Sequence, residues 1–192
     1  MREKVNKDGF AFSDAYFKLD ADITLPDGWK PIGATKDGRV NLQEGANLNA
    51  FSGIFDGAGH TITVPEGGLP LFGYVRNTRI RNLNIYGKKI AGYGLVKNFE
   101  GVGLSGSAVE IDNVTLKSGS STLKSGLLGA NKTVNGYAGC SAAFVATITN
   151  CTIEKGVVVG YDKKQSQIGA IAGRMQGTIK NCVSYADVYG TD

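Results

Sequence analysis

The sequence predicts an all-β fold, a parallel β-helix (solenoid) of about five to six coils with an N-terminal cap. The first observation is compositional: the 192-residue chain holds 28 glycines and four prolines, and no long window carries strong helix formers at helical spacing. The second is an internal repeat, and the third is a glycine-flanked apolar run that precedes its copies. A side chain that recurs at one place in successive repeats is typical of coils stacked on one another.

The repeat is the motif Ile-x-Asn followed by a mostly apolar pair of positions. It occurs as IRNLNI, IDNVTL, ITNCTI and IKNCVS, and its asparagines, separated by 31, 37 and 31 residues, are Asn82, Asn113, Asn150 and Asn181. Equivalent residues of neighbouring coils lie about 4.8 Å apart in such a fold. Asparagine tolerates the left-handed conformation, and its amide can bond to the next coil. We therefore expect an asparagine ladder at a bend between strands.

Weaker copies extend the repeat toward the N-terminus. HTITV (60–64) is expected to place Ile62 where Leu83 lies, and ADITL (21–25) is expected to lie one coil earlier. The predicted inward column consists of Ile23, Ile62, Leu83, Val114, Cys151 and Cys182. The uneven spacing predicts loops of varying length around a regular shaft. Runs such as GLPLFG (68–73) and IGAIAG (168–173) are expected to supply other strands of each coil.

Residues 1–16 do not fit the repeat. They predict an N-terminal cap or extension, with a short helix around Phe12 to Phe17, because an open solenoid end exposes unpaired strand edges. The β-helix repeat domain is expected over 17–192. The chain ends directly after a strand-like run, which favours a fragment of a longer protein.

The three cysteines, Cys140, Cys151 and Cys182, form neither a disulfide framework nor a zinc signature. Their number is odd, no C-x-x-C pair occurs, and His60 is the one histidine. In the stacked register Cys151 and Cys182 act as small buried apolar side chains. We expect three free thiols and no bound metal.

Charge and hydropathy disfavour nucleic acids as partners and insertion into a membrane. The net charge is +4, but the basic residues are scattered and do not interleave with aromatic residues, which disfavours nucleic-acid binding. No apolar run approaches the roughly 20 residues of a membrane span, and the N-terminus lacks a signal-peptide core. The glycine-rich runs lack the strand-then-helix context of a nucleotide site, so no cofactor is expected.

The segment FDGAGH (55–60) has two interpretations. His60 could act as a catalytic base, with Asp56 as the carboxylate that orients it. The alternative, which we favour because no nucleophile accompanies them, is a tight structural turn of Asp56, Gly57 and Gly59 with His60 bonded across it. The other carboxylates do not recur at the repeat register, so no catalytic residue is expected.

Aromatic residues beside loops are candidates for stacking on sugar rings. They are Trp29, Tyr86, Tyr93, Tyr137, Tyr161, Tyr185 and Tyr189. The candidate glycan contacts we single out are Trp29, Tyr93, Tyr137 and Tyr161. The alternative is that Trp29 packs beneath the first coil and the tyrosines line the ends of strands.

Three segments resemble the GLUG-type repeat region of bacterial surface and secreted proteins: YFKLDADITLPDGWKPIG (16–33), FSGIFDGAGHTI (51–62) and LFGYVRNTRIRNLNI (71–85). The later IGAIAGRMQGTIKNCVS (168–184) is similar to the repeat unit itself. The resemblance implies a right-handed, pectate-lyase-like β-helix and an extracellular or cell-surface location in a bacterium. It does not imply an activity.

The expected function is a non-catalytic β-helix module of a larger bacterial cell-surface or secreted protein, acting as a rigid spacer and adhesive scaffold. Its expected partners are host or bacterial surface glycans or proteins and the rest of the parent polypeptide, and the chain itself is expected to be a monomer. Two alternatives stay open. One is a carbohydrate-active domain of polysaccharide-lyase, glycoside-hydrolase or glycan-binding type. The weaker one is a phage tail or receptor-binding protein, which should be an intertwined trimer.

Overall fold

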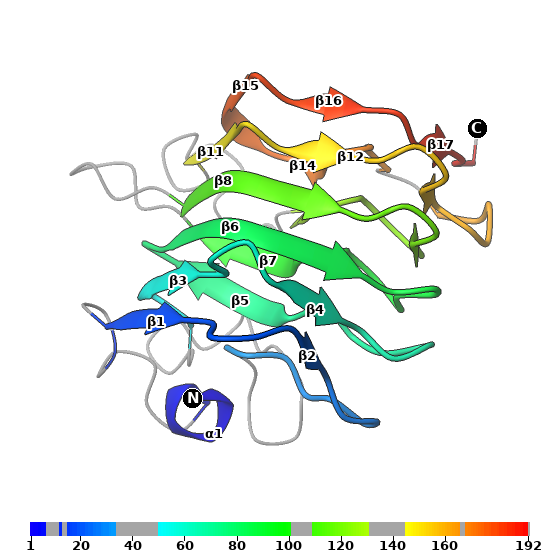
Figure 1. Ribbon diagram of the computed structural model, residues 1–192. Helices are drawn as coiled ribbons and strands as arrows, with labels where there is room; N and C mark the ends of the chain where they lie inside the picture. Colours follow the sequence, from blue (N-terminus) through cyan, green and yellow to red (C-terminus); the bar gives the residue numbers. More distant parts are fainter. Residues whose placement is uncertain are drawn as a thin grey trace, which may run out of the picture.

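The structure is a computed structural model that describes residues 1–6, 12, 15–33, 50–100, 109–130, 145–165 and 168–191. Within these residues the chain forms three β-sheets and one four-residue helix, α1 (Arg2–Val5). Every strand pair in the described residues is parallel (Figure 1). The predictions of an all-β chain and of parallel pairing are therefore confirmed.

Sheet A has ten strands, and the other two sheets are smaller. The strands of sheet A are β1 (Tyr16–Lys18), β2 (Ile23–Thr24), β3 (Ile54–Asp56), β4 (Thr61–Thr63), β6 (Arg79–Tyr86), β8 (Val109–Leu116), β11 (Val145–Thr149), β12 (Thr152–Ile153), β15 (Gln176–Lys180) and β16 (Val183–Ser184). Sheet B consists of β5 (Phe72–Arg76), β7 (Val96–Glu100), β10 (Leu128–Ala130) and β14 (Ala172–Arg174). Sheet C consists of β9 (Ser121–Thr122), β13 (Val158–Val159) and β17 (Asp187–Val188).

The chain visits the sheets in a fixed order. From β8 in sheet A it passes to β9 in sheet C, then to β10 in sheet B, and it returns to sheet A at β11. We call one such circuit a pass. Each strand pairs with the corresponding strand of the next pass, so residues far apart in sequence lie side by side (Figure 1).

Alternation of buried and outward side chains explains why these segments form strands. In β6, Ile80, Leu83 and Ile85 are buried, and Arg81 and Asn84 lie on the outer face. The alternation shifts by one residue at Asn82, whose φ is 53°. A residue in the left-handed conformation bends the strand there, and the apolar side chains on both sides of the bend still point inward.

Equivalent inward residues stack in columns. Ile80 pairs with Ile111, Ile111 with Ile148, and Ile148 with Ile179. Leu83 pairs with Val114 in a second column, and Ile85 with Leu116 in a third. These columns form one apolar core, and all their members in β6 and β8 are at most 1% exposed.

The expected position of Ile62 is wrong by two residues. Ile62 pairs with Ile85 and not with Leu83. Ile23 pairs with Ile62 as expected, but it is 40% exposed and not buried in the column. The cause is a longer turn: four residues (57–60) separate Asp56 from Thr61, whereas two (82–83) separate their partners Arg81 and Asn84. A Cβ on Gly57 would lie 2.7 Å from Leu83 Cδ1, so the backbone at Gly57 fills the place of an inward side chain.

Close backbone contacts explain the glycine-flanked runs. A Cβ on Gly94 would lie 1.9 Å from the Gly126 carbonyl oxygen, and a Cβ on Gly126 would lie 1.9 Å from that of Ala170. These residues precede β7, β10 and β14 of sheet B. Any larger residue at Gly94 or Gly126 would push neighbouring passes apart.

The N-terminal end of the core is covered, but not by the helix that we expected. The helix lies at Arg2–Val5, and Val5 is fully buried. Phe12 to Phe17 is not helical as a whole, because β1 begins at Tyr16 and pairs with β3. Asn6 ties the N-terminus to the first pass, since its side chain donates to the Pro31 carbonyl (3.0 Å) and accepts from the Gly33 N–H (2.7 Å).

The last pass is exposed. Its large apolar side chains with at least 36% exposure are Ile179, Val183, Tyr185, Val188 and Tyr189. In the described residues, no strand pairs with the outer edges of β15, β16 and β17. A given inward position therefore contributes less to stability in this pass than in the ones before it.

Substitution along one column tests this stacking. Ile111→Ala should lower the free energy of unfolding by about 2–5 kcal/mol, because Ile111 is fully buried between Ile80 and Ile148. Ile179→Ala, at the end of the same column, should cost about 1 kcal/mol or less, because Ile179 is 48% exposed. Urea denaturation followed by circular dichroism measures both. Equal losses would contradict the stacked column.

Candidate functional site

The four asparagines of the repeat occupy equivalent places. Their φ angles are 53°, 51°, 56° and 55° at Asn82, Asn113, Asn150 and Asn181, all in the left-handed region. Each follows the outward residue of a paired strand: Arg81 faces Asp112, Asp112 faces Thr149, and Thr149 faces Lys180. The asparagines therefore lie above one another at the bend of sheet A.

The amides of these asparagines form two short chains of hydrogen bonds. Asn113 Nδ2 donates to Asn82 Oδ1 (2.9 Å), and Asn82 Nδ2 donates to Asp56 Oδ1 (3.1 Å). Asn181 Nδ2 donates to Asn150 Oδ1 (3.4 Å), and Asn150 Nδ2 donates to Asp112 Oδ1 (2.7 Å). Each chain thus ends on an aspartate. A charge-assisted bond is stronger than one between amides, which favours Asp112 over Asn113 as the acceptor for Asn150.

Asp56 and the three residues after it form a turn in place of an asparagine. Asp56 Oδ1 accepts from the Ala58 N–H (2.9 Å), and Ala58 and Gly59 both have positive φ, 52° and 84°. The His60 N–H donates to the Gly57 carbonyl (2.8 Å) and closes the turn. The segment FDGAGH therefore has the geometry of an aspartate-capped turn.

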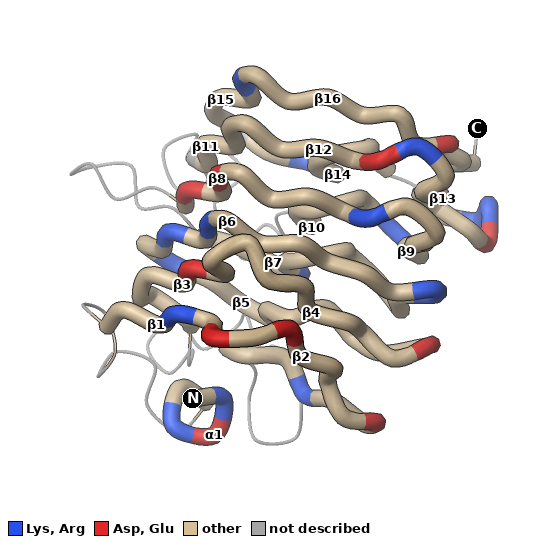
Figure 2. The backbone as a smooth tube through the Cα atoms, viewed as in Figure 1, with Lys and Arg blue, Asp and Glu red and all other residues tan. Residues whose placement is uncertain are grey.

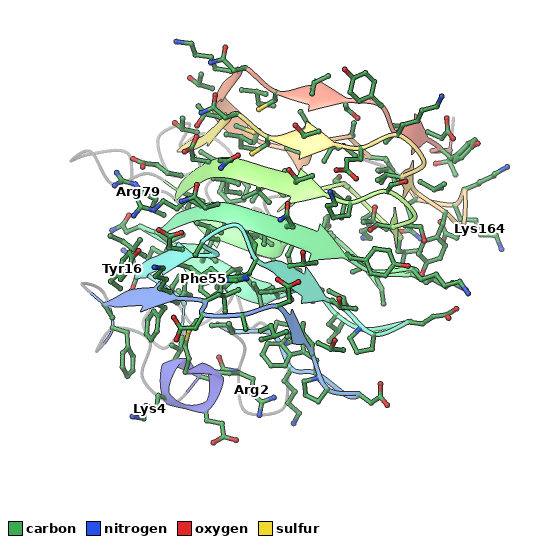
Figure 3. The ribbon with its side chains drawn as sticks, in the orientation of Figure 1. Arg2, Lys4, Tyr16, Phe55, Arg79 and Lys164 are labelled. Atoms are coloured by element: carbon green, nitrogen blue, oxygen red, sulfur yellow. The ribbon has the colours of Figure 1, made fainter. Side chains whose placement is uncertain are left out.

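Among the described carboxylates, Asp56 accepts the largest number of hydrogen bonds. Its Oδ2 accepts from the Tyr16 hydroxyl and from Arg81 Nε, both at 2.9 Å. Tyr16, labelled in Figure 3, comes from the preceding pass. Arg81 comes from the following one. Desolvation acts to raise the pKa of Asp56, but the hydrogen bonds from Ala58, Asn82, Tyr16 and Arg81 together lower it to about 2.

Asp56 and His60 are not partners. His60 Nδ1 lies 3.2 Å from Asp22 Oδ1, in the preceding pass, and the Thr61 N–H donates to the same oxygen (2.9 Å). The Thr61 N–H and the His60 ring lower the pKa of Asp22. The geometry therefore lacks the base–carboxylate pair that FDGAGH suggested.

Other outward carboxylates are held by residues of neighbouring passes. Arg79 donates to Glu110, and Thr149 Oγ1 donates to Asp112 Oδ1 (2.6 Å). Glu154 accepts from Lys117 Nζ (2.5 Å) and from the Ser118 N–H (2.8 Å), and these bonds lower its pKa. Charges of opposite sign therefore lie beside one another along sheet A (Figure 2). Among the described residues, no group of three or more His, Cys, Asp or Glu side chains could hold a metal ion.

A groove of about 420 Å³ lies on the outer face of sheet A, beyond the asparagine bend. It crosses β2, β4, β6 and the turn after β8. Its walls are formed by Asp22, Ile23, Thr24, Thr61, Thr63, Tyr86, Lys117 and Ser118. The register explains why these residues meet, because Thr24 pairs with Thr63 and Thr63 with Tyr86, although 62 positions separate Thr24 from Tyr86 along the chain.

The aromatic residues that we singled out do not gather at this groove. Trp29 Nε1 donates to the Pro70 carbonyl (3.3 Å), and Arg2 lies over its ring. Tyr93 is 9% exposed, and Lys89 lies over the ring of Tyr161. Tyr137 lies outside the described residues. Tyr86, one of the wider set of aromatic candidates, is the aromatic residue that borders the groove.

Two of the three cysteines are described, and both are free thiols, as predicted. Burial raises the pKa of the Cys151 thiol to about 12, which leaves it protonated and unreactive. Cys182 is less buried because it lies in the last pass, and its Sγ accepts from the Cys151 N–H (3.4 Å). Cys140 lies outside the described residues.

Comparisons with protein-family models, with curated proteins and with solved structures give no significant match. The helical part of the described chain is too short to cross a membrane. The geometry of the outer face and the order of the strands therefore provide the basis for a proposed function.

The low pKa of Asp56 predicts how stability depends on pH. Because the pKa in the folded state, about 2, is below the ordinary value of 3.8, the ionised group stabilises the fold fully above about pH 4. This contribution is lost as the pH falls from about 4 toward 2. Asp56→Asn should therefore cost about 2 kcal/mol at pH 7 and progressively less below pH 4, as measured by urea denaturation at each pH.

Tyr16→Phe provides the matched control for Asp56→Asn. It removes one of the donors to Asp56 and leaves the carboxylate in place. It should cost less at pH 7 and should move the acid-induced loss of stability to higher pH. A constant difference between the wild type and Asp56→Asn from pH 7 to 2 would contradict the assigned role of Asp56.

Proposed function

We propose that the strands form a right-handed parallel β-helix of about five to six coils, and that the chain is a non-catalytic module of a larger bacterial cell-surface or secreted protein. In this proposal it acts as a rigid spacer and adhesive scaffold. The observation that carries the proposal is the register: equivalent residues of successive passes pair in parallel on all three sheets. A right-handed path is the usual one for connections between parallel strands.

Stacked passes favour a stiff shaft. Ile111 and Val114 each contact equivalent residues in the passes before and after them, so a pass cannot open without exposing two apolar interfaces. The two Asp–Asn–Asn chains add polar contacts between passes at the bend. Segments between strands vary in length without disturbing this register, and they can carry binding residues.

The use of the carboxylates supports a scaffold over an enzyme. A lyase or hydrolase usually presents carboxylates free to hold a cation or to exchange protons with a substrate. Here Asp56, Asp112 and Glu154 each accept two or more hydrogen bonds from neighbouring passes. These carboxylates join passes to one another, and the lowered pKa values of Asp56 and Glu154 suit this structural role.

The proposal also includes a relationship to the GLUG-type repeat region, a bacterial origin and a surface location. These three parts are based on the sequence resemblance alone. The expected partners are surface glycans or proteins and the parent polypeptide. Of the alternatives, glycan binding has support from an observation, the polar groove on sheet A.

Hydrogen exchange tests the scaffold. Amides of β6 and β8 should exchange together, at the rate set by global unfolding, because neighbouring passes hold them on both sides. Amides of β15 and β17 should exchange faster, since their outer neighbours are missing in the described chain. Mass spectrometry of peptides from the native protein measures both. Independent opening of β8 would contradict a rigid scaffold.

The same preparation tests the enzymatic alternative. Incubation with neutral and uronate-containing polysaccharides should release neither unsaturated products nor reducing ends. Release that Asp56→Asn or His60→Ala abolishes would support an enzyme instead.

A further inference from the structure

Hydroxyl groups gather in the groove, where five of the eight lining residues carry one. Thr78, Ser121, Thr122 and Thr149 each donate their hydroxyl to an oxygen of the protein, at 2.5–2.7 Å. By contrast, no described residue bonds to the hydroxyls of the five groove residues that carry one, which are Thr24, Thr61, Thr63, Tyr86 and Ser118. The groove therefore presents a set of donors and acceptors that are free to bind a ligand.

The placement of these hydroxyls follows the pleat of sheet A. Thr61 and Thr63 are separated by the buried Ile62, so both side chains point outward from β4. Thr24 lies beside Thr63 in the preceding pass, and Tyr86 lies beside Thr63 in the following one. Neighbouring strands are about 4.8 Å apart, and alternate residues of a strand are about 6.6 Å apart. This spacing suits a ligand that carries several hydroxyls over a short length.

Tyr86 adds an aromatic surface to the polar groove. Its side chain is partly buried, and a Cβ on Gly119 would lie 3.6 Å from its Cε2, so the ring rests beside the turn after β8. An aromatic ring fixed in this way can stack on the C–H face of a sugar ring. An aromatic ring with hydroxyl groups around it suits the apolar face and the hydroxyls of a sugar.

The charges of the groove select against an acidic ligand. Lys117 is paired with Glu154 at 2.5 Å, and Asp22 lies beside His60. Lys117, Glu154 and Asp22 together carry one positive and two negative formal charges. A polyanion such as a uronate chain would gain no net attraction there and would lie close to Asp22 and Glu154.

We propose that this groove binds a neutral saccharide, with Tyr86 stacking on a sugar ring and Thr24, Thr61 and Thr63 bonding to sugar hydroxyls. This inference deepens the adhesive part of the proposed function and rests on it. A volume of about 420 Å³ is within the usual range of ligand clefts, and its open form suits part of a longer chain.

Binding of defined oligosaccharides tests the inference. The probes are hexasaccharides of xylose, glucose and mannose, with hexagalacturonate as the acidic counterpart. Isothermal calorimetry should detect binding of at least one neutral probe, and hexagalacturonate should bind more weakly. Tyr86→Ala should weaken the best neutral probe about tenfold. Thr63→Val, which keeps the size of the side chain, should weaken it about fivefold.

Tyr185→Ala is the matched control. Tyr185 follows Ser184, which pairs with Ile153, so it lies in the same outward row as Lys117 and Glu154 but outside the groove. This substitution should leave affinity unchanged. Circular dichroism of each variant establishes that it is folded.

Three results would overturn the inference: no neutral probe binds, hexagalacturonate binds best, or Tyr86→Ala and Thr63→Val bind as tightly as the wild type. These results would leave the scaffold proposal intact, because hydrogen exchange of the unliganded protein measures its rigidity independently.

Discussion

The bend at Asn82, Asn113, Asn150 and Asn181 is the constraint on which the rest of the structure depends. A strand that turned there with an ordinary backbone conformation would send its next apolar side chain to the outer face. The left-handed residue moves the alternation by one position, so that Ile80 and Leu83 both face the core. Asparagine meets this requirement at low cost, and its amide also bonds to the neighbouring pass.

Once the bend fixes the inward columns, it also fixes what lies on the outside. Asp56 lies beside Arg81 because the two are paired directly before the bend. Thr63 lies beside Tyr86 because the two are paired in the strands after the bend. The same register thus produces both the ion pairs that link neighbouring passes and the groove. The ion pairs join passes to one another, whereas the groove holds a row of hydroxyls without partners in the described chain.

The sequence is sufficient to predict the parts of this structure that repeat. A motif that recurs with Asn at a fixed place predicts parallel strands, and it locates the columns of Ile80 and Ile111. The motif gives the wrong partner for Ile62, because it does not reveal the length of the turn at 57–60. Two extra residues in that turn make Ile62 pair with Ile85, two positions beyond Leu83. The motif also misses the hydrogen bond from Asn150 to Asp112, since the choice between two adjacent acceptors depends on geometry. The groove combines residues 22–24, 61–63, 86 and 117–118, which only the pairing brings together.

The energetic coupling between asparagines tests the register most directly. In a double-mutant cycle, Asn82→Gly and Asn113→Gly keep the left-handed backbone and remove the hydrogen bond between the two side chains. Urea denaturation should give a coupling of about 0.5–1.5 kcal/mol for this pair. The same cycle on Asn113 and Asn150 should give a value near zero, because Asn150 bonds to Asp112. Equal coupling in both pairs, or none between Asn82 and Asn113, would contradict the stacking described.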